Sequence, residues 1–180
     1  MADEDYYQTI EQTATTEFKD RGSRFIAYTY PLQNLAQFKI LLQQLKNENP
    51  KAVHHCFAYR LGLGGNTFRV SDDGEPSGIA SKPMLGQIDS KGLTDVLVVV
   101  VRYFGGTLLG VPGLINAYKT AAAMALQLSP TIQKSVTVCW QLTFGYAQLN
   151  EIMRWINTFN CSIKQQELQL FCKLLVEVPL

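Results

Sequence analysis

The sequence predicts an α+β protein of two domains. A long apolar strand, Leu93–Val101, is followed by a glycine-rich turn and then by an alanine-rich helical stripe. Ser129-Pro130 interrupts that helix, and after Lys134 a new strand-helix-strand-strand pattern begins. The expected organisation is an N-terminal domain at residues 1–130, a linker at 131–135, and a C-terminal domain at 136–180.

The elements of the N-terminal domain follow from the periodicity of apolar residues. Alternation of apolar and polar residues predicts strands, and apolar residues at every third or fourth position predict helices. Gly62, Gly64 and Gly65 supply the turn of a hairpin between two of the strands. The expected strands are 23–30, 52–62, 67–70 and 93–101, and the expected helices are 35–45, 84–88 and 114–128.

The C-terminal pattern is shorter. Its expected elements are a strand at 136–144, a helix at 146–159, and strands at 161–167 and 170–178. This β-α-β-β order is three quarters of a ferredoxin-like unit, and it lacks the last helix and strand. We therefore expect an exposed sheet edge in this domain.

Composition places the chain among globular proteins and argues against several classes. Of its 180 residues, 47% are hydrophobic and 17% are charged, and the net charge is +1. RNA binding would therefore need a local patch of cations rather than a global field. The sequence shows no signal peptide, no apolar run of roughly 18 residues and no Cys-x-x-Cys pair. We expect a cytoplasmic protein with no membrane segment.

The segment RYFGGTLLG at 102–110 has the form of a phosphate-binding loop but not its chemistry. Gly105 and Gly110 have the glycine spacing of the nucleoside triphosphatase loop. Val111-Pro112 stands where that loop needs a lysine and a serine or threonine. We therefore expect no nucleoside triphosphate ligand, and no cofactor.

Arg102 lies at the end of the apolar strand, where an unpaired buried guanidinium would be costly. It must emerge at an edge or find a carboxylate. The interpretation that we favour is an ion pair with Asp72, Asp73 or Glu75, which would hold the neighbouring loop in place. Direct ligand binding by Arg102 is the alternative.

The same carboxylates support a hydrolase hypothesis. Asp72, Asp73 and Glu75 offer oxygen ligands for a divalent metal that could activate water, with His54 as a further catalytic candidate. The spacing is not that of an EF-hand, and acidic residues beside glycine are equally typical of turns. The metal site and the turn are both retained as interpretations.

His54, His55 and Cys56 are consecutive in an expected strand. The two histidines must point to opposite faces, so only one of them can serve a given site. His54 and Cys56 share a face, as a nucleophile and its base would need to. Nothing in the sequence marks an oxyanion hole beside them, so a packed, hydrogen-bonded histidine is the favoured reading.

A nucleic-acid or partner interface is the remaining hypothesis. Its cations would contact phosphate and its aromatic rings would stack on bases. The candidate residues are Arg24, Lys82, Arg102, Tyr103, Gly105, Gly106 and Lys119.

Taken together, the segments resemble the IMPACT/YigZ family. The resemblance is carried by GSRFIAY at 22–28, AVHHCFAY at 52–59, SDDGEPSGIASKP at 71–83, VVRYFGGTLLG at 100–110 and LINAY at 114–118. Pro112 departs from the family pattern, which usually has a second glycine there. Because proline fits the first turn of a helix, it would make the loop more rigid.

The resemblance implies a fold for each domain and a function in translation. The N-terminal domain would have the ribosomal protein S5 domain 2-like fold, and the C-terminal domain would be similar to the ferredoxin-like domain V of elongation factor G. Eukaryotic members resemble translation regulators. The function implied is a non-enzymatic cytoplasmic translation regulator that binds RNA or the ribosome, with a translation-associated protein as a further possible partner. A protein-docking module in the C-terminal half is an alternative.

Overall fold

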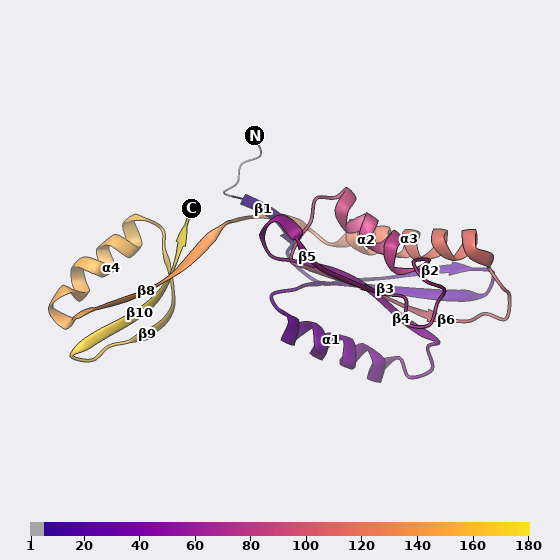
Figure 1. The fold of residues 1–180 in the computed structure, drawn as a ribbon, viewed down its shortest axis with the longest axis horizontal. Coiled ribbons are helices and arrows are strands. Elements are labelled where there is room, and N and C mark those ends of the chain that lie inside the picture. Colours follow the sequence, from indigo (N-terminus) through magenta and orange to yellow (C-terminus); the bar gives the residue numbers. More distant parts are fainter. Residues whose placement is uncertain (1–5) are drawn as a thin grey trace. The chain divides into compact units, whose positions relative to one another are not determined.

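The structure is a computed structural model that describes residues 6–180 (Figure 1). The chain divides into two compact units. The larger unit is Gln8–Gln133, and the smaller one contains Lys134–Leu180 together with Tyr6 and Tyr7 of the described N-terminal residues. The α+β class predicted from the sequence is confirmed.

The larger unit is built on a five-stranded antiparallel sheet with the strand order β2-β3-β6-β4-β5. The strands are β2 (Ala14–Asp20), β3 (Ser23–Pro31), β4 (His54–Leu61), β5 (Thr67–Ser71) and β6 (Val96–Tyr103). The predicted hairpin between β4 and β5 is present. Strand β2 was not predicted, because its residues are mostly polar and it lies at the sheet edge with every second residue exposed.

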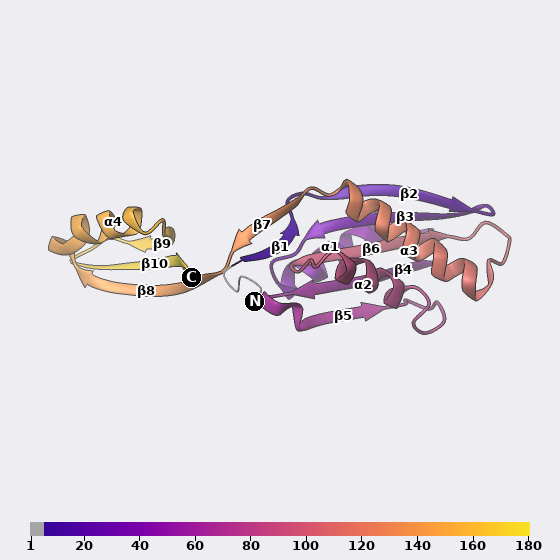
Figure 2. The same cartoon turned by 90° about the horizontal axis from the view of Figure 1, so that it is seen from above.

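Helices cover both faces of this sheet (Figures 1 and 2). Helices α2 (Ser81–Ser90) and α3 (Gly110–Leu128) pack on one face, and α1 (Leu35–Glu48) packs on the other. The sheet therefore has two cores, and β6 at its centre is buried from Val96 to Arg102. This explains why its sequence is continuously apolar instead of alternating.

Alternate residues of β6 serve the two cores. Val96, Val98 and Val100 face α2 and α3, whereas Leu97, Val99 and Val101 face the side of α1. By this alternation Arg102 belongs to the α2 and α3 side. Alanines at four buried positions of α3 allow that helix to lie close to the sheet.

The predicted linker at 131–135 is a strand. Thr131–Ser135 forms β7, which pairs with β1 (Tyr6–Ile10) in a two-stranded sheet. The sequence TIQKS contains no glycine and no proline, so nothing in it opposes an extended, paired backbone.

The smaller unit has the predicted β-α-β-β order. Its elements are β8 (Thr137–Gly145), α4 (Leu149–Thr158), β9 (Ser162–Glu167) and β10 (Phe171–Pro179). The strands form an antiparallel sheet with the order β8-β10-β9. Its core contains Phe144, Ile156, Cys172, Leu174 and Val176. Within residues 6–180, no helix is long and apolar enough to cross a membrane.

Candidate functional site

Several of the sequence candidates meet at the end of β6, where it continues into the glycine loop that leads to α3. Arg102 on β6 pairs in register with Phe25 on β3 and with His54 on β4. The segment SDDGEP follows β5, which borders β4. Three neighbouring strands and two loops therefore deliver their polar groups to one end of the sheet.

Arg102 forms a buried ion pair with Glu75. Its Nη1 donates to Glu75 Oε1 at 2.5 Å, and the side chains are only 8% and 3% exposed. The Tyr118 hydroxyl donates to the same carboxylate oxygen at 2.7 Å. The predicted pairing of Arg102 with one of three carboxylates is confirmed, and Glu75 is the partner. In this conformation the guanidinium is not available to a phosphate.

Two phenylalanines enclose the guanidinium. The Arg102 Cζ lies 5.6 Å from the centre of the Phe25 ring and 5.8 Å from that of Phe104. Phe25 also packs edge-on against Tyr118, with 5.1 Å between ring centres. Because cation–π contacts and an opposite charge both stabilise a desolvated guanidinium, the surroundings of Arg102 favour its burial.

His54 and Cys56 are on the predicted shared face, but they are not a nucleophile and its base. His54 Nδ1 lies 2.8 Å from the Asp73 carbonyl oxygen, and its Nε2 lies 3.7 Å from Glu75 Oε1. The Cys56 thiol donates to the Asp72 carbonyl oxygen at 3.0 Å. Burial raises the pKa of Cys56 to about 12, so the thiol stays protonated at neutral pH. The structure therefore gives the nucleophile interpretation no support.

Asp72 holds the acidic loop in its turn. Its Oδ1 accepts the backbone N–H groups of Ala80 and Ser81 at 3.0 and 2.8 Å, and its Oδ2 accepts that of Gly78 at 2.8 Å. Burial opposes the charge, but hydrogen bonds from these backbone groups outweigh it and keep the pKa of Asp72 below its ordinary value. The carboxylate thus organises the start of α2.

The three acidic side chains do not converge on a metal position. Asp72 turns toward α2, Asp73 Oδ2 accepts the His55 backbone N–H at 2.7 Å, and Glu75 faces Arg102. Among the described residues there is no group of three or more histidine, cysteine, aspartate or glutamate side chains that could hold a metal ion. The hydrolase hypothesis centred on His54 and these carboxylates lacks the ligand arrangement that it needs.

The glycine loop itself is fixed against the β2–β3 turn. A Cβ added to Gly105 would lie 1.9 Å from the Gly22 carbonyl carbon, so only glycine fits there. The Gly105 N–H also donates to Ser23 Oγ at 3.2 Å. Gly106 has φ of +85°, and nothing lies within 4 Å of the place of its Cβ. Gly105 therefore provides close packing, and Gly106 provides the left-handed turn.

Beyond these glycines the loop is exposed and apolar. Phe104 is 48% exposed and Leu108 is 82% exposed, and Val111 in the first turn of α3 is also exposed. Arg24 on β3 pairs in register with Tyr103, the residue before Phe104; its Cζ lies 5.5 Å from the Tyr103 ring centre and its Nη2 lies 2.5 Å from Glu17 Oε2. Tyr103 is half-buried, and its hydroxyl donates to Asn49 Oδ1 at 2.8 Å.

Arg21 is a cation at this site that the sequence did not indicate. Its Nη2 donates to the Leu109 carbonyl oxygen at 2.9 Å, just before α3 begins. Its guanidinium also covers Gly113, where an added Cβ would lie 2.7 Å from Nη2. Recognising Arg21 required the β2–β3 turn, and β2 itself was not predicted.

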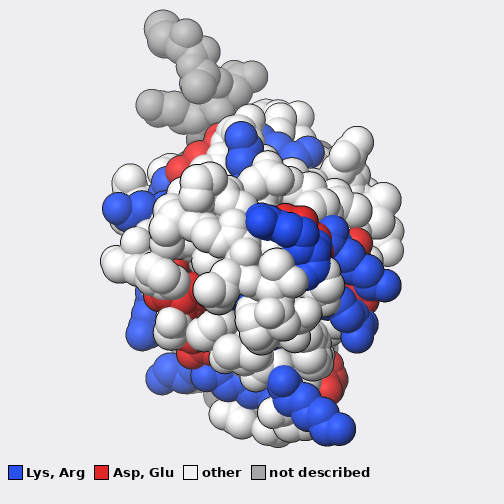
Figure 3. All heavy atoms as spheres, turned by 90° about the vertical axis from the view of Figure 1, so that its right-hand side faces the viewer, with Lys and Arg blue, Asp and Glu red and all other residues white. Residues whose placement is uncertain are grey.

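We call this region the glycine-loop surface: Phe104–Gly110 with the first turn of α3, Arg21 and Arg24. Figure 3 views that end of the larger unit, where uncharged surface is bordered by lysine and arginine side chains with acidic side chains among them. Lys82 and Lys119, the other predicted cations, are exposed on α2 and α3. The Lys82 stem covers Gly78 in the acidic loop.

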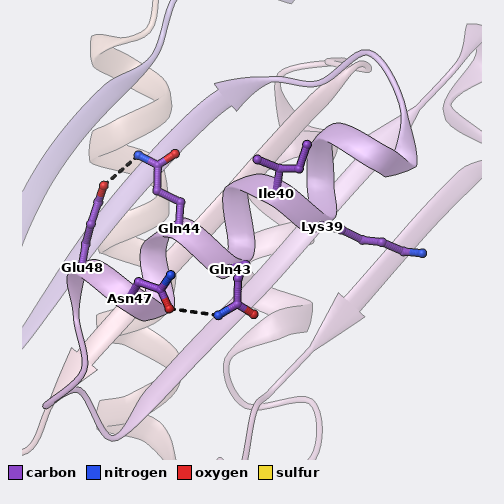
Figure 4. A pocket seen from close by; sticks show the side chains of 6 residues that line it. All are labelled: Lys39, Ile40, Gln43, Gln44, Asn47 and Glu48. Carbon is purple, nitrogen blue, oxygen red and sulfur yellow. Dashed lines mark hydrogen bonds between the residues drawn. The ribbon is translucent and has the colours of Figure 1, made fainter.

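A hollow lies on the outer face of α1 (Figure 4). Gln43 donates to Asn47 Oδ1 at 3.0 Å, and Gln44 donates to Glu48 Oε1 at 2.7 Å. The side-chain amides of both glutamines are thus paired along the helix. Lys39 and Glu48 give the hollow no net charge. Ile40 is exposed there.

Comparison with known proteins identifies the family. The family model described as the Impact N-terminal domain matches residues 21–126. The chain belongs to the IMPACT family. The match contains the acidic loop, the glycine loop and most of α3, so the buried Glu75–Arg102–Tyr118 network lies within the family domain.

Full-length relatives extend this similarity. The IMPACT family member YigZ of Escherichia coli is 35% identical over 88% of this chain and 79% of its own length. An IMPACT family member of Haemophilus influenzae is 32% identical over 96% of this chain and 84% of its own length. The likeness to bacterial members thus includes residues beyond the N-terminal family domain.

Two solved structures were also matched. One, described as the crystal structure of a hypothetical protein, is 32% identical, has a TM-score of 0.80 and covers 97% of this chain and 86% of that one. The other, whose title describes the two-domain translational regulator Yih1, is 28% identical and covers 67% of this chain and 45% of that one. Its TM-score of 0.39 supports no comparison of folds.

Proposed function

We propose that this IMPACT family protein is a non-enzymatic translation regulator that binds structured RNA or the ribosome through the glycine-loop surface. The observation that carries the proposal is the exposed loop itself. Phe104 and Leu108 are exposed in the loop before α3, Arg21 contacts Leu109 in the same loop, and Arg24 contacts Tyr103, which precedes Phe104. Membership of the family favours a role in translation.

Phosphate would bind at the start of α3. No side chain caps the N-terminus of this 19-residue helix, so its first N–H groups and the positive end of its dipole favour an anion. Arg21, whose Nε lies 3.5 Å from Asp20 Oδ1, is at the same turn, and its charge adds to the attraction of the helix end for an anion. A phosphate group would supply that anion.

A base would stack on the exposed ring of Phe104. Base–aromatic stacking and phosphate contacts together are typical of proteins that bind unpaired RNA segments. Lys82 and Lys119 would add outer phosphate contacts, and Gly105 and Gly106 would shape the loop. Arg102 and Tyr103, which are engaged by Glu75 and Asn49, would support the surface from beneath.

We infer in addition that the larger unit has the ribosomal protein S5 domain 2-like fold and that the smaller unit is a partial ferredoxin-like unit. The order β8-β10-β9 supports the second inference, because the third strand of such a unit lies between the first two. The cytoplasm, where ribosomes work, is the compartment that this function requires.

Filter binding of the full chain to a structured ribosomal RNA fragment and to ribosomal subunits tests the proposal. Phe104→Ala should weaken binding about tenfold, because stacking contributes roughly 1–3 kcal/mol per base. Ile40→Ala removes an exposed apolar side chain from the outer face of α1 and should leave binding unchanged. No binding by the wild type at low salt would overturn the proposal, as would equal effects of the two substitutions.

A further inference from the structure

Helix α3 is apolar on both of its faces. Its inner face packs on the sheet through buried residues such as Leu114 and Tyr118. Its outer face carries Val111 and Ile115, whose side chains are 52% and 38% exposed. A helix at a protein surface normally has charged and polar residues opposite the core, and a helix that is apolar all round is normally covered. The outer face of α3 therefore has the character of a face that becomes buried.

Helix α1, which covers the other face of the same sheet, has the ordinary pattern. Polar side chains such as Lys39, Gln43 and Glu48 surround Ile40 on its outer face. By contrast, the nineteen residues of α3, GVPGLINAYKTAAAMALQL, contain one charged residue, Lys119. Figure 2 looks onto this face of α3, and no other described element of the larger unit lies over it.

The outward side chains of α3 form a ridge. Residues four apart lie one above the other on a helix, and all members of this row are exposed except one half-buried alanine. The row is Val111, Ile115, Lys119, Ala123 and Gln127. It is about 24 Å long at 1.5 Å per residue. Ridges of this kind pack into the groove between ridges of another helix, so the face fits a helical partner.

Further apolar side chains widen this face. Leu108 precedes the ridge and is 82% exposed, and Leu128 at the end of α3 is 63% exposed. Met124 is also exposed, at 36%. A contiguous row of exposed apolar residues with few charges is typical of surfaces that bind another protein.

Lys119 determines the charge that the partner must carry. It is the middle residue of α3, and α3 contains no aspartate or glutamate. Within the described residues, Lys119 forms no ion pair. A partner that covers the ridge must supply a carboxylate at its centre, because an ammonium group buried without a counter-charge is costly.

The same residue argues against two other occupants. A single cation along the ridge offers RNA too few phosphate contacts, and valine and isoleucine offer its bases no ring to stack on. Two copies of α3 related by a two-fold axis and overlapping fully would bring their middle residues together. Lys119 would then face Lys119, and the like charges would repel.

We propose that the outer face of α3 is the docking site for an amphipathic helix of a partner protein. Apolar side chains of that helix pack against Val111 and Ile115, and an aspartate or glutamate at its centre pairs with Lys119. The docked helix also withdraws Lys119 from the outer phosphate contact proposed above. The site is additional to RNA binding by Phe104 and Arg21.

Two synthetic helical peptides of 19 residues, the length of α3, test the proposal. Both have leucine at the positions that face α3, except at the centre, where one has glutamate and the other has lysine. Fluorescence anisotropy measures their binding to the full chain without RNA. The glutamate peptide should bind at least about tenfold more tightly than the lysine peptide, because opposite charges attract and like charges repel across the interface.

Substitutions identify the face that binds. Ile115→Asn keeps the net charge and should weaken binding of the glutamate peptide at least about tenfold, because a buried apolar contact is lost. Ile40→Asn makes the same change on the outer face of α1 and should leave binding unchanged. Lys119→Glu should reverse the preference, so that the lysine peptide binds more tightly. Circular dichroism checks that each variant is folded.

Several outcomes would overturn the proposal. One is a wild type that binds neither peptide, and another is equal weakening by Ile115→Asn and Ile40→Asn. A preference for the glutamate peptide that survives Lys119→Glu would contradict the pairing at the centre. A wild-type dimer in sedimentation velocity that Ile115→Asn dissociates would assign the face to a second copy instead. Because RNA is absent from these measurements, their failure is distinguishable from a failure of RNA binding.

Discussion

At the scale of single residues, the site is organised by one buried carboxylate. Glu75 Oε1 accepts hydrogen bonds from Arg102 and Tyr118 and lies 3.7 Å from His54. Arg102 lies on β6, Tyr118 on α3 and His54 on β4. Glu75, which lies in a loop, therefore joins two strands of the sheet to a helix that covers it. A buried ion pair of this kind adds little net stability, but removal of one partner leaves the other charge buried without a counter-charge.

Glu75→Gln should therefore destabilise the fold strongly. It leaves the Arg102 guanidinium buried without a counter-charge, and the free energy of unfolding should fall by roughly 3–5 kcal/mol. Urea unfolding followed by circular dichroism measures this loss. As a matched control, Glu75→Met with Arg102→Met removes both charges and should cost clearly less than Glu75→Gln. A double variant at least as unstable as the single one would contradict this account of the network.

At the scale of elements, the glycine loop and the β2–β3 turn form one packed unit. Gly105 approaches Gly22 so closely that no side chain fits between them, and Arg21 from the same turn covers the start of α3. The ion pair with Glu75 fixes Arg102, whose guanidinium lies near the Phe104 ring. The exposed residues of the loop are therefore presented on a rigid base.

Substitution of the two adjacent glycines separates packing from backbone conformation. Gly105→Ala forces apart two backbone segments and should lower the free energy of unfolding by about 3 kcal/mol. Gly106→Ala meets no atom within 4 Å and should cost only about 1 kcal/mol for its positive φ. Thermal and urea unfolding of the two variants make the comparison. Equal losses, or a larger loss for Gly106→Ala, would contradict the packing role of Gly105.

The sequence indicated much of this arrangement at the level of elements. The continuous apolar run of β6, the helical stripe of α3 and the β-α-β-β order of the smaller unit were all readable from periodicity. Strands β1, β2 and β7 were missed, because they are short or polar and lie at sheet edges, where side-chain pattern is weak. The pairing of Arg102 was predicted, but three carboxylates within four residues left its partner open.

What the sequence could not indicate depends on contacts between distant segments. The approach of Gly105 to Gly22 joins residues far apart in the chain, and neither glycine is unusual in its own loop. Arg21 reads as an ordinary turn cation until its contact with Leu109 is known. Conversely, Arg102 was a candidate for phosphate binding by its position, and the burial of its guanidinium removes it from the exposed surface.

At the scale of the whole molecule, the two units differ in their exposed surfaces. The larger unit presents the cations and Phe104 of the glycine-loop surface, in a chain whose net charge is only +1. Attraction to RNA must therefore be local, and it must depend on the few cations at this end of the sheet. The smaller unit presents an apolar groove between β8 and α4, which suits a protein interface instead.

The salt dependence of RNA binding tests the central claim most directly. The slope of log affinity against log salt counts phosphate contacts at about 0.7 to 0.9 per contact. Arg21→Gln and Arg24→Gln should each reduce the slope by about that amount, whereas Lys39→Gln on α1 should not change it. Equal slopes for the wild type and both arginine variants would contradict phosphate binding at the glycine-loop surface.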